Sequence, residues 1–386
     1  MIDKNKAQNI FQEFLRIESI TPNAKKAFDF LEDLFKKNNF EIHRVKFKLD
    51  DSYEVENMFA IKGKGSPHLC FSGHVDVVTP GDHNNWRHPP FSGKIEDNRV
   101  YSRGAEDMKG SIISSLVAGI NYFEENMTSN GSLSYLITGD EEGLAINGTE
   151  PLIDWVFKQG FQIDHCIVTE PSNKEMIGDT IKIGRRGSLS FELDIIGKQG
   201  HVAYPEKAKN PIPFALKAIQ DLSGKIDEGT KDFISTNIEV TSIDVNNNAH
   251  NVIPEKMSVS FNIRFNNLWN EKSLIKFVND ILSRNFKEVK IDWKLNKISK
   301  ADVYITSSGD LSNILKESIY KKTQLEAELS SFGGTSDARF ISKYCPVIEF
   351  GLVGRTMHQI DENVPLDEFY LLTDIFEDFL VNYYSG

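Results

Sequence analysis

Strand-like and helix-like hydrophobic patterns alternate along the first 180 residues. Apolar residues recur at helical spacing within residues 11–15 and 30–35, whereas residues 41–47 and 68–73 are short apolar runs typical of strands. Further strands are predicted at residues 57–61, 132–138 and 164–169, and further helices at residues 111–123 and 151–157. This order predicts an α/β domain whose mixed sheet is covered by helices.

From about residue 181 the pattern changes to longer strands. Residues 181–197 are typical of a long antiparallel pair, and the segments that follow predict the order β, α, β, β, α, β of a small α+β sandwich of the ferredoxin-like kind. Helix and strand alternation resumes after about residue 295. We therefore predict an outer α/β domain of residues 1–180 and 295–386, interrupted by an inserted α+β domain of residues 181–294.

Composition excludes several classes of protein. The 386 residues include 44 Lys and Arg against 56 Asp and Glu, which argues against a broad nucleic-acid or acidic-membrane surface. Cys70, Cys166 and Cys345 are too few and too scattered for a disulfide framework, so we expect buried thiols. The N-terminus lacks a basic region followed by an apolar stretch, and no apolar run of about 18 residues occurs, so we expect a cytoplasmic protein without membrane segments.

His74 and Asp76 stand two residues apart in the extended segment SGHVDVV, so their side chains point to one face. One of them can bind a metal ion while the other orients it, since a carboxylate on the second ring nitrogen fixes the tautomer of a zinc histidine. A His next to an Asp is more often a surface hydrogen bond. The pair alone therefore leaves both interpretations open.

Asp107 lies in RGAEDMKGS, directly before a predicted apolar helix. Asp is a favoured N-cap residue, so capping alone would explain its position. Arg103-Gly104 before it and Lys109-Gly110 after it are not required by a cap. These neighbours favour a functional role for Asp107.

Two adjacent glutamates, Glu141 and Glu142, follow a predicted strand in TGDEEG. Neighbouring side chains diverge, so one can bind metal while the other takes the proton of a metal-bound water. A solvated acidic turn is the alternative interpretation. Glu170 also follows a strand, as His74 does, and ligands of such sheets gather at the carboxyl ends of strands. His358 lies near the C-terminus.

In their order along the chain, the motifs HVD, EDMKG, DEEG, TEP and MHQ resemble the ligand series of the two-zinc aminoacylase, deacetylase and glutamate carboxypeptidase family. The resemblance covers essentially the whole chain. It implies a zinc aminopeptidase-like catalytic domain with an inserted dimerisation or lid domain, and an amidohydrolase in which Glu141 is the general base for a di-zinc-activated water and Asp76 orients a ligand. The implied ligands are His74 and Glu170 for one ion, Glu142 and His358 for the other, and Asp107 as the bridge. Zinc suits two imidazoles and three carboxylates, with cobalt or manganese as substitutes.

Further motifs resemble the desuccinylase branch of this family, namely IGRRGSLSF, GKQGHVAYPEKAKNP, HNVIP, FNIRF and SSFGGTSDARFI. In that branch the matching positions bind a small succinylated amino acid: Arg185, His201, Tyr204, Asn251, Arg264, Gly333 and Thr335. Guanidinium groups and Gly-rich backbone amides suit a substrate with several carboxylates. His201 and Asn251 would polarise the scissile carbonyl. Strand-surface charge, a turn residue and an exposed loop are the alternatives for Arg185, Asn251 and His201.

The resemblance also implies a homodimer in which His201 acts in the active site of the partner subunit. One position departs from the family pattern: Glu106 stands where Ala is usual, directly before Asp107. The extra carboxylate would either perturb the metal site or face away from it. Two rival functions remain open. The first is an amidohydrolase of the same family with another acyl group, and the second is a non-catalytic relative, which the filled ligand and base positions disfavour.

Overall fold

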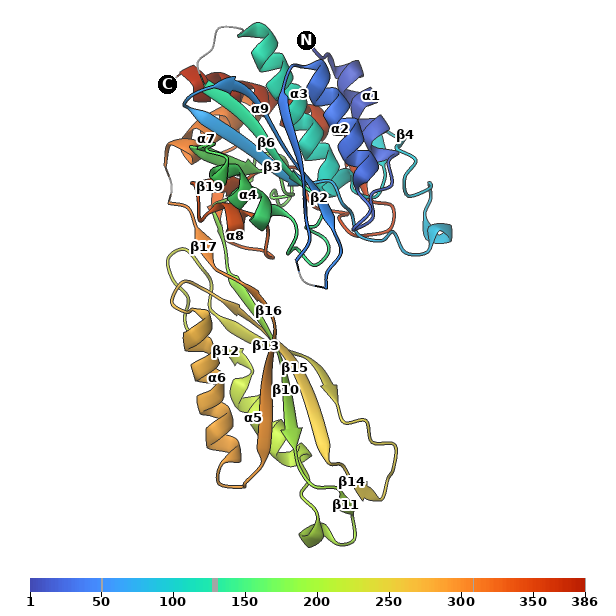
Figure 1. The fold of residues 1–386 in the computed structure, drawn as a ribbon, viewed down its shortest axis with the longest axis vertical. Coiled ribbons are helices and arrows are strands. Elements are labelled where there is room, and N and C mark those ends of the chain that lie inside the picture. Colours follow the sequence, from blue (N-terminus) through green and yellow to red (C-terminus); the bar gives the residue numbers. More distant parts are fainter. Residues whose placement is uncertain (50, 127–130, 308, 386) are drawn as a thin grey trace. The chain divides into compact units, whose positions relative to one another are not determined.

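The computed structural model describes residues 1–49, 51–126, 131–307 and 309–385 (Figure 1). The chain divides into two compact units, and each unit has a large sheet of its own. The first unit comprises Met1–Ile183, Thr306–Ser330 and Ser336–Gly386, and the second comprises Gly184–Ile305 and Ser331–Thr335. Across the described ranges, no helix combines the length and the apolar character that a membrane crossing needs. The three cysteines are free and buried, as expected.

The first unit is built on an eight-stranded mixed sheet with the strand order β1-β2-β6-β3-β7-β19-β8-β18. β3 lies between β6 and β7 and runs parallel to both, so the carboxyl ends of these three strands meet at one edge. The mixed α/β class predicted for this part is thereby confirmed. The strands are β1 (Glu41–Phe47), β2 (Val55–Lys64), β3 (His68–His74), β6 (Gly131–Thr138), β7 (His165–Val168), β8 (Thr180–Lys182), β18 (Glu328–Ser330) and β19 (Val347–Glu349).

Helices of the first unit pack on this sheet through apolar faces. In α1, the Asp3 side chain accepts the backbone N–H of Lys6 as an N-cap, and Phe11 and Phe14 are fully buried. α3 is buried over almost its whole length and packs against α9. The helices are α1 (Lys4–Leu15), α2 (Lys25–Lys37), α3 (Gly110–Glu125), α4 (Thr149–Lys158), α7 (Asp310–Thr323), α8 (Ala338–Ile341) and α9 (Leu366–Ser385).

A small three-stranded sheet connects two segments that are far apart in sequence. β20 (Asn363–Pro365) pairs with β5 (Arg99–Tyr101), which pairs with β4 (Lys94–Glu96). The chain that follows His358 therefore lies beside the chain that leads to Asp107. This pairing brings two candidate metal ligands from opposite ends of the sequence into one region of the first unit.

The second unit is a five-stranded antiparallel sheet with the order β12-β13-β15-β10-β16, packed against two helices. Residues alternate between core and surface along β15, where Val259, Phe261 and Ile263 are buried, as a half-covered sheet requires. A short pair, β11 with β14, lies outside this sheet. The elements are β10 (Gly187–Ile196), β11 (Gly200–His201), α5 (Ile212–Leu222), β12 (Gly224–Lys225), β13 (Asn237–Asp244), β14 (Val252–Ile253), β15 (Lys256–Phe265), α6 (Glu271–Phe286) and β16 (Asp292–Ala301).

Two sequence predictions for this part differ from the structure. Residues 181–197 do not form an antiparallel pair, because β8 belongs to the sheet of the first unit and β10 is a single long strand of the second. Between them, β9 (Gly184–Arg185) pairs with β17 (Tyr304–Ile305). The predicted return to the outer domain at residue 295 is also too early, since β16 pairs with β10 along its length and keeps the chain in the second unit to Ile305.

Candidate metal centre and substrate-binding residues

His74 ends β3, and its imidazole is fixed by the backbone. The Nδ1–H donates to the carbonyl oxygen of Asp76 at 2.9 Å, which directs Nε2 toward carboxylates. Nε2 lies 3.1 Å from Asp107 Oδ1 and 3.7 Å from Glu170 Oε1. Burial would lower the pKa of His74, but the hydrogen bond to Asp107 and the charge of Glu170 raise it well above its usual value. A position that favours positive charge so strongly also suits a metal cation.

Asp107 lies in the helical turn η2 (Ala105–Lys109), between β5 and α3. Asp107 is not the N-cap of α3, the alternative that the sequence offered, because Lys109 directly precedes that helix and no side chain caps it. The Asp107 carboxylate instead lies between two imidazoles, with Oδ1 toward His74 and Oδ2 3.3 Å from His358 Nε2. Burial raises the pKa of Asp107, but the hydrogen bonds from His358 and His74 outweigh it and hold the pKa well below its usual value. One oxygen for each imidazole is the arrangement that a bridging carboxylate requires.

His358 and Glu142 form the second side of the centre. His358 Nε2 lies 2.8 Å from Glu142 Oε1, and its backbone has a φ of 62°. Hydrogen bonds to Asp107 and Glu142 raise the pKa of His358 to about 10. The imidazole is half-exposed, so the loop that carries it, and not burial, holds it in place.

Two groups of side chains in the described residues could each hold a metal ion. The first is His74, Asp107 and Glu142, and the second is His74, Glu141 and Glu170. Burial raises the pKa of Glu141 and of Glu170 well above the usual value, and neighbouring carboxylates add to both shifts. Carboxylates crowded in this way repel one another, and divalent cations between them would relieve the repulsion. The donor set therefore fits a metal centre.

Asp76 holds the Glu141-Glu142 turn as well as its neighbour His74. The expected contact of its carboxylate with the imidazole is long, with Oδ1 3.7 Å from His74 Nδ1, and the carbonyl oxygen orients the ring instead. The carboxylate accepts the backbone N–H groups of Glu141 at 3.3 Å and Glu142 at 3.1 Å, and the hydroxyl of Thr21 at 2.7 Å. Asp76 thus connects the end of β3 to the turn after β6.

Sequence reasoning missed one residue of this region, Glu362. Its buried carboxylate accepts the backbone N–H groups of Glu106 at 2.9 Å and of Asp107 at 3.3 Å. The only sequence signal was an acidic residue four positions after His358, and such residues are common on surfaces. Its role depends on a contact across some 255 residues of chain, which no local pattern encodes.

The residues predicted to bind substrate all lie in the second unit, whereas the predicted metal ligands and base all lie in the first. Gly333 allows Arg185 to approach, because a Cβ at Gly333 would lie 2.1 Å from Arg185 Nη1. Arg264 comes from β15, and its Nη1 is buried without a hydrogen-bond partner among the described residues. Thr335 is exposed at the end of the same short segment as Gly333.

His201, Tyr204 and Asn251 lie together around the short β11–β14 pair. The rings of His201 and Tyr204 are 5.7 Å apart, and the Val202 N–H donates to the Asn251 carbonyl at 3.1 Å. All three predicted residues are exposed. The Ala203 N–H donates to His201 Nδ1 at 3.1 Å, so in the neutral ring Nε2 carries the proton and is available as a donor.

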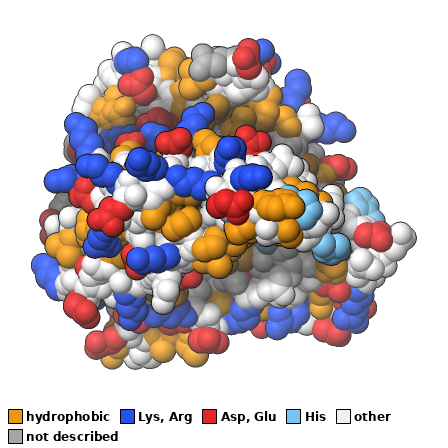
Figure 2. All heavy atoms as spheres, turned by 90° about the horizontal axis from the view of Figure 1, so that it is seen from below, with side chains coloured by type: hydrophobic (Ala, Val, Ile, Leu, Met, Phe, Trp, Pro, Cys, Tyr) orange, Lys and Arg blue, Asp and Glu red, His pale blue; other side chains and the backbone are white. Residues whose placement is uncertain are grey.

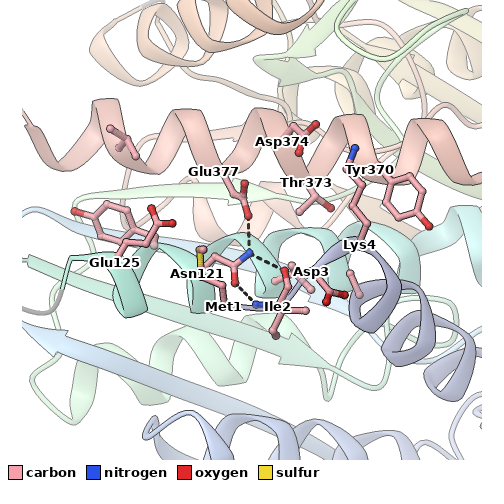
Figure 3. Close-up of a pocket in the computed structure, with 14 residues that line it drawn as sticks. Met1, Ile2, Asp3, Lys4, Asn121, Glu125, Tyr370, Thr373, Asp374 and Glu377 are labelled. Carbon is pink, nitrogen blue, oxygen red and sulfur yellow. Dashed lines mark hydrogen bonds between the residues drawn. The ribbon is translucent and has the colours of Figure 1, made fainter.

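A separate cavity of about 390 Å³ lies in the first unit among the N-terminal residues, α3 and α9 (Figure 3). Asn121 bonds both backbone groups of Ile2, accepting its N–H at 2.6 Å and donating to its carbonyl at 3.1 Å, and it also donates to Glu377. None of the candidate metal residues lines this cavity. Its polar contacts anchor the start of the chain.

Comparison with known proteins identifies the class. The model of peptidase family M20/M25/M40 matches residues 70–382, and the chain belongs to this family. A succinyl-diaminopimelate desuccinylase of Rhodopseudomonas palustris (strain TIE-1) is 46% identical over 384 residues, which covers 98% of each chain.

Among solved structures, a tripeptidase from Staphylococcus aureus has a TM-score of 0.81 at 19% identity over the full length of both chains. A dinuclear metal-binding peptidase of the M20 family from Bacillus subtilis has a TM-score of 0.73 at 12% identity, over 98% of this chain and 97% of that one. At such low identity these two structures support the fold alone.

Proposed function

We propose that this protein hydrolyses N-succinyl-LL-2,6-diaminopimelate to succinate and LL-2,6-diaminopimelate, as a cytoplasmic enzyme of lysine and diaminopimelate biosynthesis. The observation that carries the proposal is the Asp107 carboxylate, with one oxygen toward each of two imidazoles, in a chain that matches a named desuccinylase over 98% of its length. The reaction is the cleavage of one amide bond by water.

The proposed centre holds two zinc ions, for which cobalt or manganese can substitute. His74 with Glu170 would hold one ion, Glu142 with His358 would hold the other, and Asp107 would bridge them. Bound metal ions supply a water of lowered pKa and a Lewis acid for the amide carbonyl. Two distances support this pairing: Glu142 Oε1 lies 2.8 Å from His358 Nε2, and Glu170 Oε1 lies 3.7 Å from His74 Nε2.

Glu141 is the proposed general base, which takes a proton from the attacking water and delivers it to the leaving amine. The backbone N–H of Glu141 donates to the Asp76 carboxylate, and the Glu141 carboxylate lies close to the side chains of His74 and Glu170. Adjacent residues diverge, so Glu142 can serve as a ligand while Glu141 remains free for proton transfer. Asp76 positions both residues through one carboxylate.

The second unit is proposed to bind the substrate carboxylates. Arg264 offers a buried guanidinium nitrogen that lacks a partner among the described residues, and a carboxylate would satisfy it. Arg185, Gly333 and Thr335 offer a guanidinium group, backbone amides and a hydroxyl on neighbouring segments. Asn251 and the Nε2–H of His201 would donate to the carbonyl oxygen as it becomes negative.

We also propose that the second unit dimerises the chain and donates His201 to the partner subunit, with Tyr204 beside it. Val202 and Tyr204 are large exposed apolar side chains, 45% and 54% exposed, next to His201. β11 and β14 are the lowest labelled elements in Figure 1, and Figure 2, seen from below, shows hydrophobic side chains next to histidines. Exposed apolar groups next to a functional histidine are what a shared site needs.

The test is an amide-hydrolysis assay with N-succinyl and N-acetyl forms of diaminopimelate and ornithine, with and without a chelator. We expect chelator-sensitive release of succinate from the diaminopimelate substrate and much slower turnover of the acetyl compounds. Preference for N-acetylornithine would reassign the protein to the deacetylases of the same family. No turnover of any substrate by zinc-loaded protein would favour the non-catalytic alternative.

A further inference from the structure

Glu106 is a buried carboxylate that faces away from the metal ligands. Its side chain is 1% exposed and accepts the backbone N–H groups of Arg355 at 3.2 Å and Thr356 at 2.5 Å. It also accepts the Thr356 hydroxyl at 2.8 Å. The sequence left open whether Glu106 perturbs the metal site or faces away from it, and these contacts show that it faces away. It holds the start of the loop that carries His358.

Glu362 makes the reverse connection. It lies on the His358 loop, yet its carboxylate accepts the backbone N–H groups of Glu106 and Asp107. Arg103 completes the arrangement: its Nη1 donates to Glu362 at 2.6 Å and its Nη2 donates to the His358 carbonyl at 3.3 Å. All these donors and acceptors lie in the first unit.

The two loops thus hold each other through one buried carboxylate apiece. Removing Glu362 would leave the buried N–H groups of Glu106 and Asp107 unsatisfied. Removing Glu106 would release the partly buried N–H groups of Arg355 and Thr356, and with them the start of the His358 loop. His358 is the group most exposed to such movement, because its side chain is 48% exposed and is not held by core packing.

We propose that Glu106 and Glu362 are reciprocal positioning residues that keep His358 in register with Asp107 and so preorganise the second metal position. This inference rests on the proposed ligand roles of Asp107, Glu142 and His358. Neither glutamate touches the reacting atoms. Their effect is on the distance between two ligands that come from loops about 250 residues apart in sequence. The first position, with His74 and Glu170, does not depend on the Arg355–Thr356 backbone.

The test is a zinc titration of metal-stripped protein against a competing chromophoric chelator, which yields two dissociation constants. Glu106→Ala should raise the dissociation constant of the second metal position, that of Glu142 and His358, by about 10–100-fold. This is the usual effect of removing a group that supports a metal ligand. The dissociation constant of the first position should be nearly unchanged. Glu106→Gln, which keeps one oxygen acceptor, should lie between Glu106→Ala and the wild type.

Glu368→Ala is a matched control, since Glu368 binds the Arg355 guanidinium at 2.8 and 3.0 Å but none of the loop N–H groups. It should retain both constants. Should Glu106→Ala fail to fold, Thr356→Val removes the hydroxyl that donates to Glu106 and accepts the Asn363 N–H at 3.0 Å. It leaves the two backbone N–H groups on Glu106 in place and should raise the second dissociation constant less than Glu106→Ala, while Thr356→Ser should restore it.

The outcomes separate this inference from the proposed function. Wild-type protein that binds fewer than two ions would refute the ligand assignment itself. Two ions in the wild type with unchanged constants in folded Glu106→Ala, or with equal losses at both positions, would overturn the positioning role alone.

Discussion

The carboxylate of Asp76 accepts the backbone N–H of Glu142 at 3.1 Å, although the two residues lie on different strand ends. The same carboxylate holds the N–H of Glu141. Asp76→Asn keeps the size of the side chain but replaces one acceptor oxygen with an amide that would face a donor. We expect turnover to fall about 10–100-fold with weaker metal retention, measured by kcat and by zinc content after dialysis.

Thr21→Val is the control for that variant, because it removes only one donor to Asp76. Its effect should be smaller than that of Asp76→Asn. The His74 ring should keep its orientation in both variants, since the Asp76 carbonyl holds it. An Asp76→Asn enzyme with wild-type kcat would show that the turn does not need this support.

Glu141 and Glu142 should respond differently to the same substitution. Glu141→Gln should retain metal, but its kcat should fall by about 10²–10⁴-fold, the range that a general base contributes. Glu142→Gln should lose metal instead, because it removes the carboxylate 2.8 Å from His358. Metal analysis and kcat of both variants check this, and the opposite pattern would reverse the assignment of ligand and base.

Much of the fold could be predicted from hydrophobic periodicity, because most elements present one apolar face. Periodicity marks a strand but not its partner, which is why residues 181–197 were misread. The stretch 184–187 resembles a hairpin turn in composition, yet it carries the chain from one sheet to another. The close approach of Gly187 to the Phe265 ring, where a Cβ would lie 2.1 Å away, is invisible in the sequence.

The candidate site could be predicted in its residue types and less well in its contacts. The structure brings His74, Asp107 and Glu142 within reach of one another. The prediction was wrong where backbone geometry decided the contact, as with Asp76, whose carbonyl oxygen and not its carboxylate orients the His74 ring. It also missed Glu362, whose role exists only once the two loops are folded together.

Zinc-loaded protein should contain up to two metal ions per chain, since the carboxylate and imidazole donors form two sides around Asp107. Chelation should abolish activity and added zinc should restore it, because the metal lowers the pKa of the attacking water. Metal analysis after zinc loading and activity after chelation are the measurements. A content that never exceeds one ion would argue against a co-catalytic pair.

Arg44 should give the first unit an acid-sensitive contribution to stability. Hydrogen bonds from Lys25 and Arg44 hold the pKa of Asp29 below its usual value, and those from Lys36 and Arg44 do the same for Glu32. A lowered folded-state pKa stabilises the fold fully above the unfolded pKa and is lost as pH falls through the folded value. Arg44 also binds the Glu56 carboxylate at 2.8 Å. Arg44→Met should therefore cost about 1 kcal/mol at neutral pH, and little in strong acid, where the ion pairs of Arg44 with its three carboxylate partners are lost.

The measurement is the urea midpoint of unfolding of metal-free wild type and of metal-free Arg44→Met, taken at a series of pH values from neutral down into acid. Metal-free protein is used so that loss of metal in acid does not contribute. Arg44 also lies 6.0 Å from the Phe28 ring. A difference that is the same at every pH would mean that Arg44 acts through this packing and not through its ion pairs.

A mixture of two inactive variants tests whether His201 acts on the partner subunit. In a mixed dimer of His201→Ala and Glu141→Ala, the His201→Ala subunit keeps its base and receives an intact His201 from its partner, whereas the other site has both defects. Random exchange makes half of the dimers mixed, so activity should return to roughly a quarter of wild type, as an isologous two-fold interface requires. If His201 acted within its own chain, every site would carry one defect. Absence of recovery after verified subunit exchange would therefore reject the shared site.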